Sequence, residues 1–424
     1  MPLHPYQNNA QKAIFPLHLN AKTLLRIFMH ITGYVLVLGA VTFWGCHPTL
    51  KKAARHPGEA LTRVKFFYPH FQDDMNFDSL ISAINKNIEY LKRLPLERPF
   101  RYGPDTFTCR EVLESQKAFR RLLEQEPDIA RLNRIIQENY YIYRAAGRAG
   151  NNKVLFTGYF EPVFEARLTP DETFQYPIYG KPDDLVYIDL SLFGARFQGQ
   201  RLMARMEGDT VRPYYSRSQI DHDRVLEGRD LELAWLKDPV DVAFLQIQGS
   251  GRLRLADGGI LSVGYAASNG HPYRSIGRYM IKNGLMDRET MSMQAIRQYL
   301  RNHPEQRNEI LNHNPSYVFF RVLENGPLGN IGVPLTPGRS IALDAALFPK
   351  GALAFISCVK PALDPEGEIT RWEPFSRLVI NQDTGGAIKG AGRADLFWGN
   401  GPEAEMAAGH LKHEGELFIL IRKP

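Results

Sequence analysis

From Val154 to the C-terminus the chain consists largely of short apolar runs separated by glycine and proline, and this pattern restricts its fold more than any other feature. Such runs predict strands, and Asp257-Gly258-Gly259 predicts a hairpin turn between two of them. Many short strands in succession favour a barrel, because closure leaves no unpaired edge. The runs are VLFTGYFEPVF, YPIY, LVYIDL, DVAFLQIQ, GRLRLADGGILSVGYA, SYVFFRVL, SIALDAALFP, GALAFISCV, FSRLVINQD, DLFWGNG and GELFILI.

Residues 77–146 have a helical period instead. Apolar residues recur three or four positions apart, and Ser79 and Asp128 are predicted to cap the two main stretches. Three further helices are expected at 274–283, 292–301 and 305–312. The expected fold class is therefore α+β, mostly β. The apolar positions are Leu80, Ile84, Ile88 and Leu91 in the first stretch, and Ile129, Leu132, Ile136 and Tyr140 in the second.

The N-terminus resembles an export or anchor segment. An uncharged stretch from Ile27 to Gly45 follows Lys22 and Arg26, which is typical of a signal sequence. It is just under the roughly 20 residues that cross a bilayer, so a cleaved signal and a retained helix both remain open. Cys46 stands where a bacterial lipoprotein would be acylated, although the two residues before Gly45 depart from that pattern. A buried cysteine of no consequence is the remaining alternative for Cys46.

Charge and cysteine content exclude some classes of function. The 424 residues carry 52 Lys plus Arg against 46 Asp plus Glu, a net charge of +6. Half of this charge lies in residues 1–45, which hold three basic residues and no acid, so no nucleic-acid partner is expected. The other two cysteines, Cys109 and Cys358, either pair or stay as buried free thiols.

The segment 381–402, NQDTGGAIKGAGRADLFWGNGP, is the densest in residues that can carry chemistry. Its six glycines allow the backbone to approach a ligand closely. It does not fit a nucleotide loop, because Asp395 stands where the third glycine of GxGxxG belongs and Lys389 is followed by Gly390. Two other motifs fail as well: Gly249-Ser250-Gly251 lacks the flanking glycines of a serine nucleophile, and His410 and His413 lack a third metal ligand.

Asp395 is the candidate catalytic acid. It lies beside Leu396-Phe397-Trp398, and bulky apolar neighbours raise the pKa of a carboxyl group by desolvation. The aromatic side chains also suit stacking on a sugar ring. The alternative for Asp395 is a structural carboxylate, and Asp383, before Thr384-Gly385-Gly386, is expected to hold a turn or orient a neighbour.

Seven motifs together resemble the membrane-bound lytic murein transglycosylase A family. They occur in the family order from Phe156 to Pro402, which makes the resemblance specific. The motifs are FTGYFEP, YPIY, IQGSG, NGHPYRSIG, MSMQAIR, NPSYVFF and QDTGGAIKGAGRADLFWGNG.

The resemblance implies a fold of two domains with a groove between them. Residues 47–160 and 323–424 would form a discontinuous double-psi β-barrel domain with helices, after an anchor segment at 1–46. Residues 161–322 would form an inserted β-rich domain that binds substrate.

The resemblance also implies a reaction, cleavage of the β-1,4 bond between N-acetylmuramic acid and N-acetylglucosamine in peptidoglycan without water. The product would carry a 1,6-anhydromuramic acid end, and the enzyme would be a lytic exotransglycosylase, although the residues themselves do not distinguish end from internal cleavage. The family's single catalytic aspartate falls on Asp395. An ordinary glycosidase needs two carboxyl groups, whereas here the sugar's own C6 hydroxyl supplies the nucleophile. No metal or organic cofactor is implied.

Other matched residues receive weaker roles. Asp383 and Lys389 would support Asp395, and a larger set of residues would contact the substrate. The expected partners are the glycan strands, complexes of murein synthesis and the membrane, which an anchor at Cys46 would reach. The protein would lie on the periplasmic side of the cell envelope. An outer-membrane lipoprotein is favoured over a retained helix. The expected substrate-binding residues are Tyr159, Gln248, Ser250, Tyr273, Thr384, Gly385, Gly386 and Trp398.

Two alternatives remain beside this reading. A muramidase-type hydrolase would need a second carboxylate at the site, for which Asp383 is the nearest candidate. A murein-binding scaffold lipoprotein would need no catalytic acid, yet the aspartate and its aromatic neighbours are retained.

Overall fold

Six strands close into a barrel, and these strands come from widely separated parts of the chain. The computed structural model describes residues 53–148, 151–324 and 326–424. Around the barrel the order is β19-β16-β17-β15-β18-β5, and β19 pairs with β5 to complete the ring. The bounds are β5 Val154–Glu161, β15 Ser340–Ala342, β16 Leu353–Leu363, β17 Ile369–Asp383, β18 Arg393–Asn400 and β19 Lys412–Arg422. The prediction of a barrel is confirmed, although β16, β17 and β19 have 11, 15 and 11 residues and are not short.

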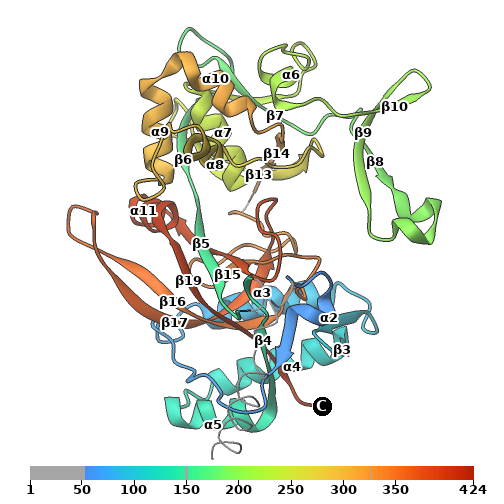
Figure 1. Cartoon of the computed structure of the whole chain (residues 1–424), viewed down its shortest axis with the longest axis vertical. Helices are drawn as coiled ribbons and strands as arrows, with labels where there is room; N and C mark the ends of the chain where they lie inside the picture. The colour runs from blue at the N-terminus through green and yellow to red at the C-terminus, as the bar shows by residue number, and fades with distance from the viewer. Residues whose placement is uncertain (1–52, 149–150, 325) are drawn as a thin grey trace, which may run out of the picture. The chain divides into compact units, whose positions relative to one another are not determined.

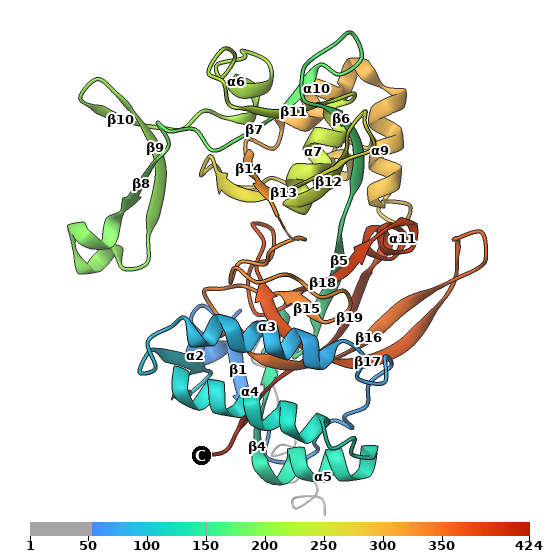
Figure 2. The ribbon, with the colours of Figure 1, turned by 180° about the vertical axis from the view of Figure 1, so that it is seen from behind.

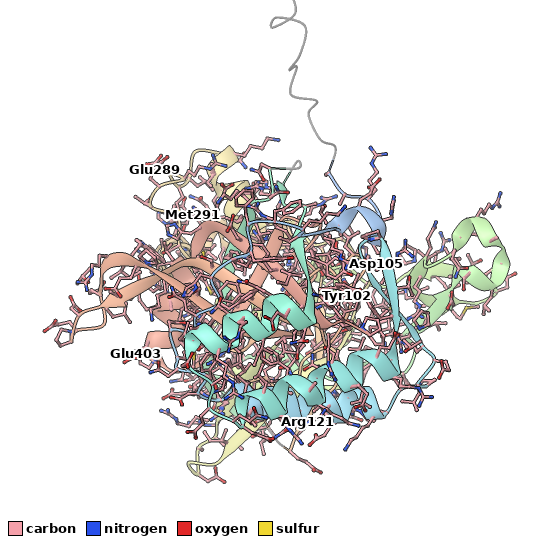
Figure 3. The ribbon with its side chains drawn as sticks, turned by 90° about the horizontal axis from the view of Figure 1, so that it is seen from below. Tyr102, Asp105, Arg121, Glu289, Met291 and Glu403 are labelled. Atoms are coloured by element: carbon pink, nitrogen blue, oxygen red, sulfur yellow. The ribbon has the colours of Figure 1, made fainter. Side chains whose placement is uncertain are left out.

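Two additional strands and three helices pack against this barrel. Strands β1 (Leu61–Arg63) and β4 (Tyr140–Ala145) extend its sheet beyond β19. Helices α3 (Leu80–Lys92), α4 (Cys109–Leu123) and α5 (Ile129–Asn139) bury their apolar sides in the same core as the strands. Figure 2 shows the three helices on one side of the body, and Figure 3 shows α4, which carries Arg121, from below. The short helix α2 (Pro57–Ala60) and the hairpin β2–β3 (Pro99–Tyr102, Asp105–Thr108) complete this part.

A second sheet contains the strands between β5 and β15. Its order is β14-β13-β12-β6-β11-β7, with a separate three-stranded sheet of β10-β9-β8 that projects from it in Figure 1. The bounds are β6 Val163–Arg167, β7 Tyr176–Tyr179, β8 Val186–Asp189, β9 Arg201–Glu207, β10 Thr210–Pro213, β11 Glu232–Leu236, β12 Ser250–Arg254, β13 Ile260–Ser268 and β14 Val318–Leu323.

Helices in this region pack on one another and on the second sheet. Val240 and Phe244 of α7 share a small core with residues of α8, α9 and α10. The predictions of helices at 274–283, 292–301 and 305–312 are confirmed within two residues. The bounds are α6 Arg217–Asp221, α7 Pro239–Gln248, α8 Ile276–Lys282, α9 Met293–Asn302, α10 Pro304–Asn312 and α11 Pro402–His410, with 3-10 turns at Leu190–Phe193 and Ala195–Phe197.

Strand pairing separates the two sheets at Pro162 and after Leu323, within two residues of the predicted domain boundaries. Strand β5 belongs to the barrel and β6 to the second sheet, so the chain passes directly from one to the other (Figure 1). The division into a discontinuous barrel domain and an inserted domain, and the double-psi topology, stay predictions that this pairing supports.

Three local predictions are wrong. The segment 77–146, predicted to be helical, also contains the hairpin β2–β3 at 99–108 and ends in strand β4, so Tyr140 begins a strand and is not part of a helix. The run DVAFLQIQ is not a strand but most of α7: the Asp238 side chain caps the helix by accepting a bond from the Val240 amide (2.9 Å), and Gly249 ends it at φ 79°. Most residues of α7 are buried, so its apolar pattern shows neither the 3.6-residue period of a half-buried helix nor the two-residue period of a half-buried strand clearly. Ser79 makes no side-chain cap on α3, because its backbone is left-handed at φ 60°.

Other local predictions are confirmed. Asp128 accepts a bond from the Arg131 amide (2.7 Å) and caps α5, and Gly258 turns the β12–β13 hairpin. Of the two alternatives for Cys109 and Cys358, the structure shows the second, since both are buried free thiols. None of the helices in the described residues is long and apolar enough to cross a membrane. The anchor expected at 27–45 and Cys46 lie outside those residues.

One buried ion pair joins the N-terminal part of the chain to the barrel. The Arg339 side chain is fully buried and donates to both carboxylate oxygens of Asp73, at 2.6 and 2.8 Å. It also donates to the carbonyl oxygen of Leu378 in β17 (2.8 Å), while Asp73 accepts from the Leu378 amide (3.0 Å). Asp73 and Arg339 therefore tie the segment before α3 to β17 and to the start of β15.

We predict that Arg339→Met lowers the free energy of unfolding by about 3–5 kcal/mol, because it leaves the Asp73 carboxylate buried without its cation. The exposed pair of Arg371 and Glu373 on β17 provides the control, and Arg371→Met should cost less than about 1 kcal/mol. Denaturant unfolding of both variants measures the difference. Equal losses would contradict a special role for the buried pair.

Candidate active site

A cavity of about 380 Å³ lies where the barrel meets the second sheet. The barrel side is formed by Thr157 to Tyr159 of β5, the loop 385–388, β18 and the end of α11. The opposite side comes from α7, the segments 273–277 and 291–296, and the start of β14. Residues more than 230 positions apart in sequence thus line one cavity. Those that bear on the chemistry are Thr157, Tyr159, Arg217, Gln248, Tyr273, Gly385, Gly386, Arg393, Asp395 and His410.

Asp395 lines this cavity and is held by neighbouring strands. On β18 it pairs in register with Ala342 of β15 on one side and with Thr157 of β5 on the other. The Thr157 hydroxyl donates to Asp395 Oδ1 at 2.6 Å, and the Arg393 guanidinium donates to the same hydroxyl oxygen at 3.3 Å. The carboxyl group is thus fixed in position and half-buried, and it remains accessible from the cavity.

Burial raises the pKa of Asp395 above its ordinary value. The Thr157 hydrogen bond and the positive charge of Arg393 both favour the carboxylate, but they offset the effect of desolvation only in part. Asp395 therefore holds its proton to a higher pH than an exposed aspartate does. A proton donor in a glycosidic reaction requires this property.

Asp383 lies at the end of β17 with both oxygens occupied. Oδ1 accepts from the Asn330 and Thr384 amides at 2.9 Å each, and Oδ2 accepts from the Tyr159 hydroxyl at 2.9 Å. Burial raises the pKa of Asp383 to about 6, although the three hydrogen bonds act to lower it. The charge of Asp395 adds to the rise. Asp383 does not line the cavity, so the geometry fits its predicted supporting part better than that of a second catalytic group.

Asp344, which sequence reasoning missed, holds the glycine-rich loop. Its side chain accepts from the Gly390 amide at 2.7 Å and from the Ala346 amide at 3.0 Å. The only signal in the sequence is its position just after a short apolar run. Thr157, Arg393 and Arg217 were missed for a similar reason, because their neighbours in space are distant in the chain.

The wall opposite Asp395 combines predicted and unpredicted residues. Tyr273 lines the cavity close enough to Arg217 and Arg393 for their charges to act on its hydroxyl group. Arg217 is buried and donates to Asp221 (3.2 Å) and to the Ser316 carbonyl (3.0 Å). Gln248 accepts from the Phe160 amide at 3.0 Å, which links α7 to β5.

Several predicted site residues do not line the cavity. Lys389 is exposed, Ser250 is buried at the start of β12, and Thr384 contributes its backbone amide to Asp383. Trp398 packs with Phe160 and Ala408 and does not line the cavity, so the geometry does not support its predicted stacking on a sugar. This packing explains Gly158, where a Cβ would lie 2.7 Å from Trp398 Cδ1.

The described residues contain no group of three or more His, Cys, Asp or Glu side chains placed to hold a metal ion. His410 lines the cavity, with Nδ1 at 3.0 Å from the Met406 carbonyl oxygen, and the His413 ring lies 4.1 Å from that of Trp372. His410 and His413 therefore contact different residues and do not belong to a common group of metal ligands in the described part of the chain.

Comparison with known proteins assigns the family. The family model described as "MltA specific insert domain" matches residues 155–321, and "3D domain" matches 339–421. Membrane-bound lytic murein transglycosylase A of Vibrio cholerae serotype O1 is 35% identical over 283 residues, which cover 65% of this chain and 68% of that protein. This chain belongs to that family. It is therefore an enzyme of the lytic transglycosylase class.

Solved structures agree with this assignment. A membrane-bound lytic murein transglycosylase from Agrobacterium tumefaciens has a TM-score of 0.70 at 32% identity, covering 86% of this chain and 98% of that one. Escherichia coli MltA with bound chitohexaose has a TM-score of 0.65 at 27% identity, covering 89% of this chain and 98% of that one.

We predict that Asp383→Asn stabilises the protein relative to wild type as pH rises from about 4 to 7. The wild-type carboxyl group binds its proton more tightly when folded, so its contribution to stability is lost as pH rises through about 6. The amide keeps an acceptor for the two backbone donors. Denaturant unfolding across this pH range, with the exposed Asp223→Asn as control, measures the effect. A difference that does not grow with pH would contradict the raised pKa.

Proposed function

We propose that this chain cleaves the glycan strands of peptidoglycan at the bond between N-acetylmuramic acid and N-acetylglucosamine, forming a 1,6-anhydro end without water. Asp395 carries the proposal, because it is a single cavity-lining carboxyl group with a raised pKa. The relatives' names give murein as their substrate, and the E. coli relative binds chitohexaose, a chain of similar sugars.

One carboxyl group suffices for the proposed reaction. Protonated Asp395 gives its proton to the glycosidic oxygen as the bond from that oxygen to C1 breaks. The resulting carboxylate takes the proton of the C6 hydroxyl while the C6 oxygen bonds to C1. Asp395 ends in its starting state, and the nucleophile belongs to the sugar whose bond is cleaved, which makes the second step intramolecular.

The position of Asp383 favours this reaction over hydrolysis. A hydrolase would need a second carboxylate facing the substrate, either as nucleophile or as base. The oxygens of Asp383 accept three hydrogen bonds from Tyr159, Asn330 and Thr384, and the group does not line the cavity. Its proposed role is to hold Tyr159 and the start of the glycine-rich loop beside Asp395.

Other roles follow from the geometry as proposals. Tyr159, Tyr273, Gln248, Gly385 and Gly386 line the cavity and would contact the sugars. The expected anchor at Cys46 would hold the enzyme on the periplasmic face of a membrane, in agreement with the "membrane-bound" names of the relatives. The double-psi barrel would be the scaffold that carries β5 and β18.

We predict that the full-length chain releases muropeptides lighter by one water than lysozyme products from the same murein. Asp395→Asn should abolish release, because its amide has no acidic proton to give, whereas the exposed Asp257→Asn should leave it unchanged. Mass analysis of the products measures this. Products of lysozyme mass would assign a hydrolase, and binding without release would assign a scaffold.

We predict that activity falls as pH rises through the raised pKa of Asp395, because the carboxylate cannot donate a proton. Thr157→Val removes a hydrogen bond that favours the carboxylate, so the pKa of Asp395 rises further and the fall moves to higher pH. Thr370→Val, at an exposed position on β17, is the matched control. Initial rates of product release across pH test both statements, and a flat profile to well above neutral pH would exclude this role for Asp395.

A further inference from the structure

A second, smaller cavity of about 180 Å³ is lined by three cationic side chains, those of Arg98, Arg101 and Lys350. Arg98 precedes β2 and Arg101 lies within it, and Lys350 lies near the end of the loop between β15 and β16. We call this space the Lys350 cavity. Its remaining lining is mainly apolar, from Pro57, Tyr90, Phe100 and the segment 345–349.

The cations of the Lys350 cavity have no anionic partner among the described residues. Arg101 donates to the Gly103 carbonyl oxygen (2.9 Å) and to the Thr106 hydroxyl oxygen (2.9 Å), both of them neutral acceptors. Lys350 donates to the neutral side-chain oxygen of Asn330. Most other cations near the barrel, such as Arg339, Arg377 and Lys360, do pair with carboxylates. Three uncompensated positive charges around one cavity favour an anionic ligand.

A short chain of hydrogen bonds connects this cavity to the active site. Lys350 donates to Asn330 Oδ1, and the Asn330 amide donates to Asp383 Oδ1 at 2.9 Å. Partial burial lowers the pKa of Lys350, the charge of Arg98 lowers it further, and the Asp383 carboxylate raises it. Lys350 is therefore near enough to Arg98 and to Asp383 for both charges to act on it. Arg201 of β9, which also lowers this pKa, brings a further positive charge from the three-stranded sheet.

We propose that Arg98 and Lys350 form an anion site that binds a carboxylate of the murein strand held at Asp395. This proposal rests on the proposed function, and chitohexaose cannot satisfy it because that oligosaccharide has no carboxylate. Murein offers carboxylates from two sources, the peptide stems and, where a stem has been removed, the lactyl group of the muramic acid. A guanidinium or ammonium group makes charge-assisted bonds to a carboxylate, and these are stronger than bonds between neutral groups.

The test measures the affinity of three ligands for the full-length chain with and without the double substitution Arg98→Gln/Lys350→Gln. The ligands are stem-bearing murein oligomers, the same oligomers freed of stems by an amidase, and neutral chitohexaose. All proteins carry Asp395→Asn, so that binding is measured without turnover. The control pair Lys65→Gln/Lys282→Gln removes two exposed charges that line neither cavity.

We expect the double variant to bind at least one carboxylate-bearing ligand about 10-fold more weakly, with chitohexaose affinity unchanged and less dependence on salt. A loss confined to stem-bearing oligomers identifies the stem as the source, and a loss confined to stripped oligomers identifies the lactyl group. No loss with either, or an equal loss with chitohexaose, would overturn the anion site. Failure of the proposed function shows separately, as the absence of product release by the protein with Asp395 intact.

Discussion

The buried pair of Asp73 and Arg339 is the interaction on which the rest of the arrangement depends. Asp73 precedes the first long helix and Arg339 precedes β15, so 265 residues of chain, including the whole second sheet, lie between them. Both side chains also bond to the backbone of Leu378 in β17. Two charges buried in this way are costly unless paired, which makes the register of β15 and β17 strongly specified. Strand β15 in turn pairs with β18 at Asp395.

Barrel closure explains why one aspartate can be both rigid and desolvated. Asp395 has a strand on each side, Thr157 in β5 and Ala342 in β15, and both neighbours are fixed by backbone pairing. The residue therefore has little freedom to move, and water reaches it mainly through the cavity. Burial then raises its pKa, while Thr157 and Arg393 limit that rise. The raised pKa of Asp395 follows from where the strands meet, because an exposed aspartate has no such shift.

A series of charged and polar groups extends outward from Asp395 along the barrel. Asp395 faces the cavity, Asp383 stands behind it with its oxygens occupied, and Asn330 connects Asp383 to the cation of Lys350. Carboxyl groups with raised pKa values thus lie next to an uncompensated positive region. An acid at the cavity with cations farther out suits a polymer whose backbone is neutral and whose branches are anionic.

Most element types and the family motifs could be predicted from the sequence, and so could the choice of Asp395 as the candidate acid, because these depend on local patterns: apolar period, turn residues and a dense glycine segment. The sequence misassigned α7, whose residues are buried on most sides and so show no single period. It also could not show that the Trp398 ring packs with Phe160 and Ala408. Only the tertiary structure decided which residues surround Asp395. Thr157 and Tyr273 lie more than 100 positions away from it, and no local rule relates residues that barrel closure and strand pairing bring together.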